Sequence, residues 1–308
     1  MPFNCVVPAK WVPDTKNITG QAMKEDGTVN RQALPAVFNP EDLNALEMAL
    51  DIVEKHGGTV TVITMGIPSA AQLLRESLYR GVDRVILLTD RRFAVADTLA
   101  TSYTLARAIQ KLWTVDLVLC GRQAIDGDTA QVGPQTAEKL HWPQITYVEA
   151  IVKLMRKKIR ARRSIGRGYE LMEASLPALL TVMSSANEPR PPRAKRLIKF
   201  KNAKAPAEIM DAVRKEMTVG ETKPDEAAVQ AEVDRRIAGL KEKGLLIEEW
   251  KAEDIDAELD RIGINGSPTK VRKIEFVKIK ATETRMVDPT DESLGELVRE
   301  LIADHTIG

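Results

Sequence analysis

Strand-like apolar runs alternate with helical patterns over the first 150 residues, and this alternation limits the fold more than any other feature of the sequence. The runs 59–65, 84–88 and 116–120 are short and rich in Val, Ile and Leu, as buried strands are. In 40–55 and 98–112 the apolar residues recur every three or four positions, which predicts helices. Repeats of this length predict right-handed crossovers and a parallel sheet with helices on both faces. In such sheets ligands bind beyond the carboxyl ends of the strands.

The pattern changes at about Thr146, where segments 147–153, 159–165 and 169–173 predict a small antiparallel extension of the sheet. The apolar run 178–183 predicts one further strand. The chain then becomes charged and helical, and its tail predicts an extended arm followed by a terminal helix. The expected fold class is therefore α/β, with a parallel sheet, an antiparallel β extension and a C-terminal arm.

Composition excludes several classes of function. The net charge of +1 argues against a dedicated nucleic-acid binder, which carries a clear surplus of cations. No apolar run reaches the roughly 18 residues that cross a bilayer, and the N-terminus lacks the pattern of a signal peptide. We therefore expect a cytoplasmic protein with no membrane insertion. No group of His, Cys and acidic residues has metal-site spacing, and no Ser-His-Asp or Cys-His order suggests a catalytic residue.

The most informative segment is 120–138, which follows a predicted buried strand and precedes a predicted helix. Gly127 and Gly133 would let the backbone approach a ligand closely. Backbone N–H groups at the start of the helix would face a phosphate, helped by the helix dipole. Thr129 and Gln131 can add hydrogen bonds from their side chains. The residues alone leave open the alternative of an ordinary tight turn with an N-cap.

Two carboxylates in this segment, Asp126 and Asp128, would repel a phosphate, so we expect them to fix the turn or to bind ribose hydroxyls. The segment closely resembles the signature of electron transfer flavoprotein β subunits. Four other segments resemble motifs of the same family, in the same order: 10–15, 39–42, 187–190 and 266–269.

The resemblance implies a Rossmann-like nucleotide-binding domain of the adenine nucleotide hydrolase type, paired with an α subunit that holds FAD. The β subunit itself binds AMP in the non-bifurcating members and a second FAD in the electron-bifurcating ones. The contacts implied for this chain are Pro8, Ala9, Asn39, Pro40, Glu41, Asp42, Met65, Gly121, Arg122, Gln123, Ala124, Ile125, Asp126, Gly127, Asp128, Thr129, Ala130, Gln131 and Val132. Because proline has no N–H, a contact at Pro8 must use its ring or its carbonyl.

Segment 93–104 is similar to a segment of the electron-bifurcating branch that the other members lack. Hydroxyls and free N–H groups at a helix start suit a second pyrophosphate. The further contacts implied are Ala96, Asp97, Thr98 and Thr101. Val95 departs from the branch, where glycine is common, and this weakens close approach to a ligand. The alternative is a helix cap rich in Thr and Ser that only packs on the sheet.

These resemblances imply a subunit that binds FAD, takes a hydride from NADH and divides the electron pair between two acceptors. The redox partner would be an acyl-CoA dehydrogenase or a quinone oxidoreductase. Whether the subunit is itself an enzyme stays open, because the chemistry would belong to the flavin. One alternative is a non-bifurcating subunit that binds AMP structurally. The alternative from another class is a universal-stress-type regulator that binds ATP.

After the motif at 187–190 the family places a leucine that anchors acyl-CoA dehydrogenases, and the residue here is Ala194. Loss of such an anchor costs on the order of 2 kcal/mol of binding, so we expect an acidic partner that docks on charge. The expected docking residues are Arg190, Arg193, Ala194, Lys195 and Arg196. The alternative is that these cations pair with the acidic segment 208–258 of the same chain.

The expected organisation has three regions. Residues 1–203 form the nucleotide-binding domain with its antiparallel extension. Residues 204–249 form a charged helical insertion relative to the family, and residues 250–308 form an arm and helix that contact the α subunit.

Overall fold

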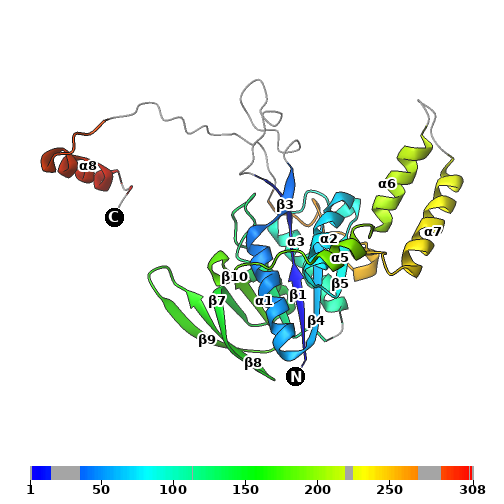
Figure 1. Ribbon diagram of the computed structural model, residues 1–308, viewed down its shortest axis with the longest axis horizontal. Helices are drawn as coiled ribbons and strands as arrows, with labels where there is room; N and C mark the ends of the chain where they lie inside the picture. Colours follow the sequence, from blue (N-terminus) through cyan, green and yellow to red (C-terminus); the bar gives the residue numbers. More distant parts are fainter. Residues whose placement is uncertain are drawn as a thin grey trace. The chain divides into compact units, whose positions relative to one another are not determined.

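The structure is a computed structural model that describes residues 2–14, 35–112, 114–218, 225–269, 286–304 and 306. It forms two units, residues 1–271 and 272–308, and each is described by itself. The described part of the first unit is built on a nine-stranded sheet with the order β11-β5-β4-β1-β6-β10-β7-β8-β9. Figure 1 shows β7, β8 and β9 side by side, in green. Pairing is parallel from β11 to β7 and antiparallel from β7 to β9. The predicted α/β fold class is confirmed.

The strands of this sheet are β1 (Phe3–Pro8), β4 (Gly58–Met65), β5 (Arg84–Leu88), β6 (Leu117–Gly121), β7 (Gln144–Met155), β8 (Lys158–Ser164), β9 (Tyr169–Ser175), β10 (Ala178–Val182) and β11 (Glu248–Trp250). A separate antiparallel pair joins β2 (Trp11–Pro13) to β3 (Ala36–Phe38). The strand β7 pairs in parallel with β10 on one side and antiparallel with β8 on the other. It is therefore where the parallel sheet becomes the antiparallel extension.

Two apolar layers enclose the parallel sheet. The helices α1 (Pro40–His56) and α2 (Ala71–Arg80) pack on one face, and α3 (Thr98–Lys111) and α4 (Val132–Leu140) pack on the other. Within β1, Cys5 and Val7 belong to the first layer and Val6 to the second. Successive side chains of a strand point to opposite faces, so a strand covered on both faces needs apolar residues throughout. This explains the unbroken apolar runs of the sequence.

Beyond β10 the chain forms α5 (Ala194–Phe200), α6 (Pro206–Met217) and α7 (Glu226–Glu242) before β11 joins the sheet beside β5. The helices α6 and α7 form a hairpin with a small apolar core of its own, made of Ile209, Val213, Val229 and Val233. Short 3-10 turns are η3 (Pro68–Ala70), η4 (Arg91–Phe93), η5 (Ser184–Ala186) and η6 (Glu253–Ile255).

The described part of the second unit contains the helix α8 (Asp291–Ala303), none of whose residues is buried. Most of the predicted arm, residues 270–285, lies outside the described residues. Among the helices that the structure describes, none is long and apolar enough to cross a membrane.

Candidate functional site

The carboxyl ends of β1, β4 and β6 lie along one edge of the sheet, because these strands are parallel neighbours. Pro8 and Ala9 are buried where β1 ends, and Met65 is half-buried at the end of β4. The signature loop leaves β6 after Gly121 and enters α4 at Val132. The predicted contacts from these three strand ends therefore lie on the same edge. Sequence reasoning missed Ile67, an apolar side chain that is 72% exposed just after β4.

The start of α1 supports the signature loop. Asn39 donates its side-chain N–H to the carbonyl of Gln123 at 2.9 Å and accepts from the Ile125 N–H at 3.1 Å. Glu41 accepts from the Gln123 N–H at 3.0 Å and pairs with Arg122 at 3.2 Å. Asn39 and Glu41 are both buried. These residues thus hold the loop in shape, and their contact with a nucleotide stays a prediction.

Asp42 joins the ends of two strands. One of its carboxylate oxygens accepts from the Lys10 N–H at 2.8 Å, and the other accepts from the Gly121 N–H at 2.9 Å. Burial raises the pKa of Asp42 to about 7, although these hydrogen bonds act in the opposite direction. A Cβ atom on Gly121 would lie 2.5 Å from an Asp42 oxygen, so the approach of α1 to β6 requires glycine there.

Backbone N–H groups of the signature loop form a cradle, defined by Thr129, Ala130 and Gln131. Asp128 and Ala130 have left-handed φ angles of 49° and 53°, whereas Gln131 is right-handed with a φ of −95°. Successive N–H groups in such a conformation make a concavity that binds anions. Within the described residues, no protein group accepts from the N–H groups of the cradle. The cradle therefore has the backbone conformation and the available N–H donors of an anion-binding site.

Both carboxylates of the signature loop are already engaged by neighbouring side chains. The Lys10 ammonium donates to the two oxygens of Asp126 at 2.7 and 2.8 Å. The Gln123 amide donates to Asp128 at 2.8 Å. These contacts agree with the expected role of fixing the turn, and the binding of ribose hydroxyls stays a prediction. The cation of Lys10 also offsets the repulsion between Asp126 and a bound phosphate.

The start of α3 is linked to the same loop. Asp97 caps the helix by accepting from the N–H groups of Leu99 and Ala100 at 2.9 and 3.0 Å, and its contact with a cofactor stays a prediction. The Thr98 hydroxyl donates to the side-chain oxygen of Gln131 at 2.8 Å. This bond joins the two predicted phosphate-binding motifs into one polar surface. The other residues predicted in this segment, Ala96 and Thr101, are half-buried.

A short motif from the end of the first unit completes this cap. The Asp97 N–H donates to the Ser267 hydroxyl at 2.8 Å, and the Thr269 N–H donates to the Asp97 carboxylate at 3.0 Å. Burial alone would raise the pKa of Asp97, but hydrogen bonds from backbone N–H groups lower it overall. Segment 266–269 resembles a family motif, but nothing in the sequence indicates that this motif contacts α3.

The two glycines singled out in the signature have different surroundings. A Cβ atom on Gly127 would meet nothing within 4 Å, so this position is open to a ligand. A Cβ atom on Gly133 would lie 2.8 Å from the Thr181 side chain and 2.9 Å from the Cys120 sulfur. Gly133 therefore lets α4 pack on the sheet. The prediction that Gly133 gives a ligand access to the backbone is wrong.

The basic segment after β10 is only partly available to a partner. Arg190 pairs with Glu47 at 2.9 Å and also with Glu54, and Arg193 pairs with Glu54 at 2.9 Å. Arg196 donates to two carbonyl groups at the end of α2. The contacts of these arginines are thus with α1 and α2, and the alternative of pairing with segment 208–258 is wrong for them. The remaining docking candidates, Ala194 and Lys195, are exposed.

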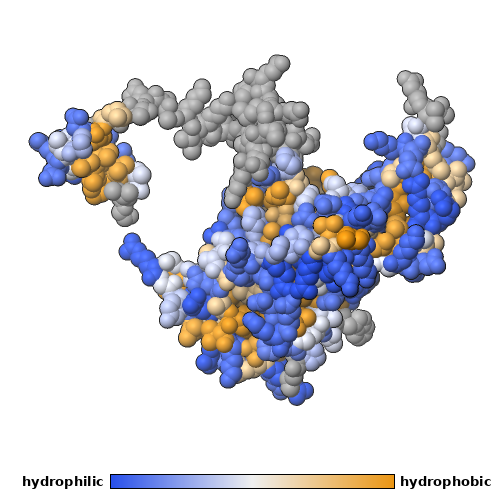
Figure 2. Space-filling view, viewed as in Figure 1, coloured by the Kyte–Doolittle hydropathy of each residue, from blue (hydrophilic) through white to orange (hydrophobic). Residues whose placement is uncertain are grey.

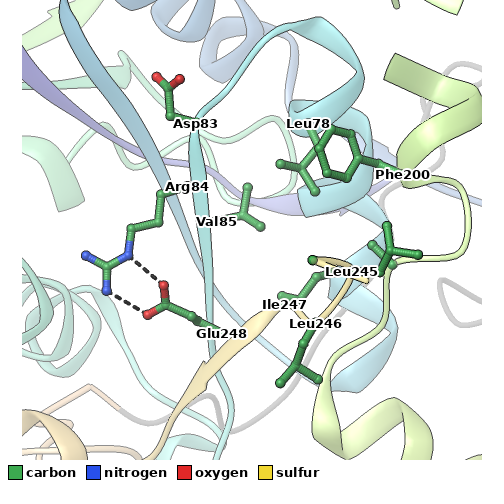
Figure 3. Close-up of a pocket in the computed structure, with 11 residues that line it drawn as sticks. Leu78, Asp83, Arg84, Val85, Phe200, Leu245, Leu246, Ile247 and Glu248 are labelled. Carbon is green, nitrogen blue, oxygen red and sulfur yellow. Dashed lines mark hydrogen bonds and ion pairs between the residues drawn. The ribbon is translucent and has the colours of Figure 1, made fainter. Parts of the chain in front are cut away.

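Two hollows in the described surface lie away from this edge. One of about 130 Å³ is at the amino end of β5, where Leu78, Phe200 and Leu246 line it (Figure 3). The other, of about 220 Å³, is at the amino ends of β1, β4 and β5. Neither hollow is lined by the residues of the candidate site, which is recognised by its N–H groups.

Comparison with known proteins agrees with this geometry. Residues 26–219 match the electron transfer flavoprotein domain family. The electron transfer flavoprotein subunit beta of Clostridium acetobutylicum is 38% identical over 305 residues, which cover 99% of this chain and 100% of that protein. The caffeyl-CoA reductase-Etf complex subunit CarD of Acetobacterium woodii is 39% identical, covering 98% and 99%. Protein FixA of Azorhizobium caulinodans is 36% identical, covering 96% and 94%. The chain therefore belongs to the electron transfer flavoprotein family, among its β subunits.

Proposed function

We propose that this chain binds FAD at the carboxyl edge of its sheet, within a heterodimer whose α subunit holds a second FAD. NADH would supply the hydride. Electrons would leave for a redox partner such as an acyl-CoA dehydrogenase or a quinone oxidoreductase. The proposed function is thus flavin-based electron bifurcation, and one relative is by name a subunit of a caffeyl-CoA reductase-Etf complex.

The hydrogen bond between Thr98 and Gln131 is the observation that carries the proposal. AMP has one phosphate, which the cradle alone could hold. FAD has a pyrophosphate that joins two large halves, so it needs donors over a longer path. The start of α3 extends the path, because the first N–H groups of a helix have no partner within it. Among the described residues, nothing accepts from the Thr98 N–H.

Bound FAD would supply the chemistry for accepting a hydride and passing on electrons. The residues of this chain would orient it. The N–H groups of the cradle and of Thr98 would bind phosphate oxygens, and Asp97 would keep the start of α3 in position. Asn39, Glu41 and Asp42 would keep the signature loop preformed, which lowers the ordering cost of binding.

Nucleotide content of the purified heterodimer tests the proposal directly. Two FAD per heterodimer, both bleached by NADH, are expected. One FAD and one AMP would instead identify a non-bifurcating subunit. A monomer that binds ATP without flavin would favour the universal-stress-type regulator, against which the family match already argues.

The variant Gly127→Val tests the cradle. The valine would add bulk to the signature loop two residues before the cradle, where a Cβ atom meets no other atom within 4 Å, so we expect at least a tenfold loss of nucleotide affinity with the heterodimer still assembled. Gly239→Val is the matched control, because Gly239 in α7 also has nothing within 4 Å of its Cβ position. Nucleotide content should be measured after equal dialysis of both variants. Equal retention in both would contradict the cradle.

A further inference from the structure

Tyr147, in β7, has a backbone conformation that bulky residues avoid. Its φ is 57°, in the left-handed region where a bulky side chain is an outlier. The pairing of β7 with β10 shifts register beside it, between Leu180 and Val182. A bulge of this kind redirects a side chain, and bulges are frequent next to functional sites. A conformation this costly persists only where the surrounding structure fixes it.

Hydrogen bonds from β10 and the residue after it fix the backbone at this point. The Tyr147 N–H donates to the hydroxyl of Thr181, a buried residue, at 3.0 Å. The next carbonyl, that of Val148, accepts from the Met183 N–H at 3.0 Å. The Tyr147 side chain nevertheless stays 37% exposed. The strained backbone is therefore held firmly, while the ring that it directs is only partly covered.

The Tyr147 ring lies beside Arg122 of the signature loop. The guanidinium carbon is 6.0 Å from the ring centroid, at the limit of a cation–π contact. The Arg122 N–H donates to the Val182 carbonyl at 2.9 Å, just beyond the end of β6. Because β10 lies between β6 and β7, the two side chains meet across the end of β10. They are therefore at the carboxyl edge that carries the candidate site.

Arg122 also borders the crevice in which a nucleotide is expected. The first crossover places β4 on one side of β1, and a later one places β6 on the other side. The strand order thus reverses between β1 and β6. In open α/β sheets, ligands bind outside the carboxyl ends of the strands at such a point. Arg122 is the first residue after β6, so its side chain starts at the border of this crevice.

The guanidinium of Arg122 has one nitrogen left for a ligand. Its Nε donates to the Glu41 carboxylate at 3.3 Å, and its Nη2 lies 3.2 Å from the other oxygen of that carboxylate. Among the residues that the structure describes, none accepts from Nη1. Glu41 is buried and fixes one edge of the guanidinium. The Tyr147 ring is a second support for the same group.

We propose that Tyr147 is a positioning residue for FAD, whose ring holds the Arg122 guanidinium so that Nη1 donates to an oxygen of the bound cofactor. This inference rests on the proposed function and adds to it a residue outside the predicted contacts. It also gives the strained backbone a role. A regular strand would send the side chain at this position in another direction, because the bulge is what redirects it.

Titration of the apo heterodimer with FAD, followed by quenching of flavin fluorescence, tests the proposal. We expect Tyr147→Leu to weaken one of the two bound equivalents of FAD about three- to tenfold. Tyr147→Phe keeps the ring and should bind FAD like the wild type. Tyr147→Gly should bind FAD as weakly as Tyr147→Leu but unfold at a higher urea concentration, because glycine accepts the left-handed φ. This pair of variants separates binding from stability.

A double-mutant cycle tests whether Tyr147 acts through Arg122. Arg122→Lys keeps a cation beside Glu41 but loses the planar guanidinium and its remaining nitrogen. Adding Tyr147→Leu to Arg122→Lys should weaken FAD binding no further, because the group that the ring supports is already gone. Additive losses would overturn the proposal.

Tyr169→Leu is the matched control. The Tyr169 ring also lies beside a guanidinium, that of Arg162 at 5.6 Å, but in the antiparallel extension. Figure 2 shows hydrophobic side chains over this extension, where Val152 and Leu171 are more than half exposed. A leucine therefore suits that surface, and FAD affinity should stay unchanged. A loss in Tyr169→Leu equal to that in Tyr147→Leu would count against a specific role for Tyr147.

Two further results would contradict the role of Tyr147. One is wild-type FAD affinity in Tyr147→Leu, and the other is a Tyr147→Phe variant that binds as weakly as Tyr147→Leu. A wild-type heterodimer that takes up AMP in place of the second FAD would overturn the proposed function instead. The same cycle of Tyr147 and Arg122 variants, titrated with AMP, would then still decide whether Tyr147 positions Arg122.

Discussion

At the scale of single residues, Val95 shows strain beside the candidate site. Its φ of 59° is left-handed and its side chain is 76% exposed, so no buried contact compensates for the conformation. A left-handed conformation costs a non-glycine residue about 1–2 kcal/mol, and glycine loses about 0.5–1 kcal/mol through the entropy of the unfolded chain. We expect Val95→Gly to stabilise the protein by about 1 kcal/mol in urea unfolding. Val152→Gly, at an exposed valine within β7, should destabilise it, and the opposite order of the two variants would contradict the prediction.

Asp42 gives the site a dependence on pH. Burial raises its folded pKa to about 7, whereas an unfolded Asp has a pKa of about 3.9. Between these values the folded protein binds more protons than the unfolded one. The stabilising contribution of Asp42 is therefore complete below about pH 4 and is lost as pH rises through about 7.

The variant Asp42→Asn stays neutral at every pH and isolates this effect. We expect the free energy of unfolding of the wild type, minus that of the variant, to fall from pH 4 to about pH 7 and to level off above it. Urea unfolding at several pH values measures the difference. A constant or rising difference would show that the hydrogen bonds from Lys10 and Gly121 keep Asp42 ionised in the folded state.

At the scale of elements, periodicity predicts most of the sheet but not its edges. The run 84–88 is β5 as predicted, and 178–183 is β10 to within one residue, because both are buried and apolar. The strand β11 contains two glutamates in three residues, so its sequence carries no strand signal. It pairs with β5 and buries Trp250 in the second apolar layer, while Glu248 pairs with Arg84 at 2.6 Å and the Thr89 N–H donates to the Trp250 carbonyl. Such pairings depend on residues far apart in the chain, which a local pattern cannot show.

The α6–α7 hairpin is predicted to be removable. Its core is separate from both layers of the sheet, and its two ends meet where Lys204 bridges Leu246. Replacing residues 210–243 with a short Gly/Ser linker keeps Glu208, which pairs with Arg75 at 2.9 Å. We expect unchanged nucleotide content and a thermal midpoint within a few degrees of the wild type. Loss of nucleotide would show that the hairpin is part of the site.

At the scale of the whole molecule, the sequence predicts which loops form the candidate site, but it does not predict the hydrogen bonds that join these loops. Parallel strands place all loops that follow them at one edge, so the position of the signature segment follows from topology. The hydrogen bonds from Asn39 to Gln123 and from Thr98 to Gln131 do not follow from topology, because each joins residues far apart in the chain. For the same reason, the sequence does not show that Asn39 and Glu41, which it predicts as ligand contacts, also hold the signature loop by hydrogen bonds.

The helix α8 has apolar residues on one face, and none of them is buried: Leu294, Leu297, Val298, Leu301 and Ile302. We propose that the α subunit covers this face, since burying a Leu, Ile or Val side chain completely contributes about 1.5–3 kcal/mol. A stop codon after Thr269 removes the arm and α8 but keeps the contact of Thr269 with Asp97. An earlier end, after Ile264, would also disturb α3 by removing Ser267.

We expect the chain that ends at Thr269 to keep its nucleotide and to bind the α subunit at least tenfold more weakly. Sedimentation velocity of the heterodimer over a dilution series measures nucleotide content and assembly together. Flavin absorbance reports the bound flavin, and the sedimentation coefficient reports whether the heterodimer is intact. Full-length Leu294→Asp/Val298→Asp separates α8 from the arm, since it changes only the exposed apolar face. If this double variant dissociates like the truncated chain, α8 carries the contact. If the truncated heterodimer stays intact at nanomolar concentration, the first unit alone holds the α subunit, and the apolar face of α8 must serve another partner.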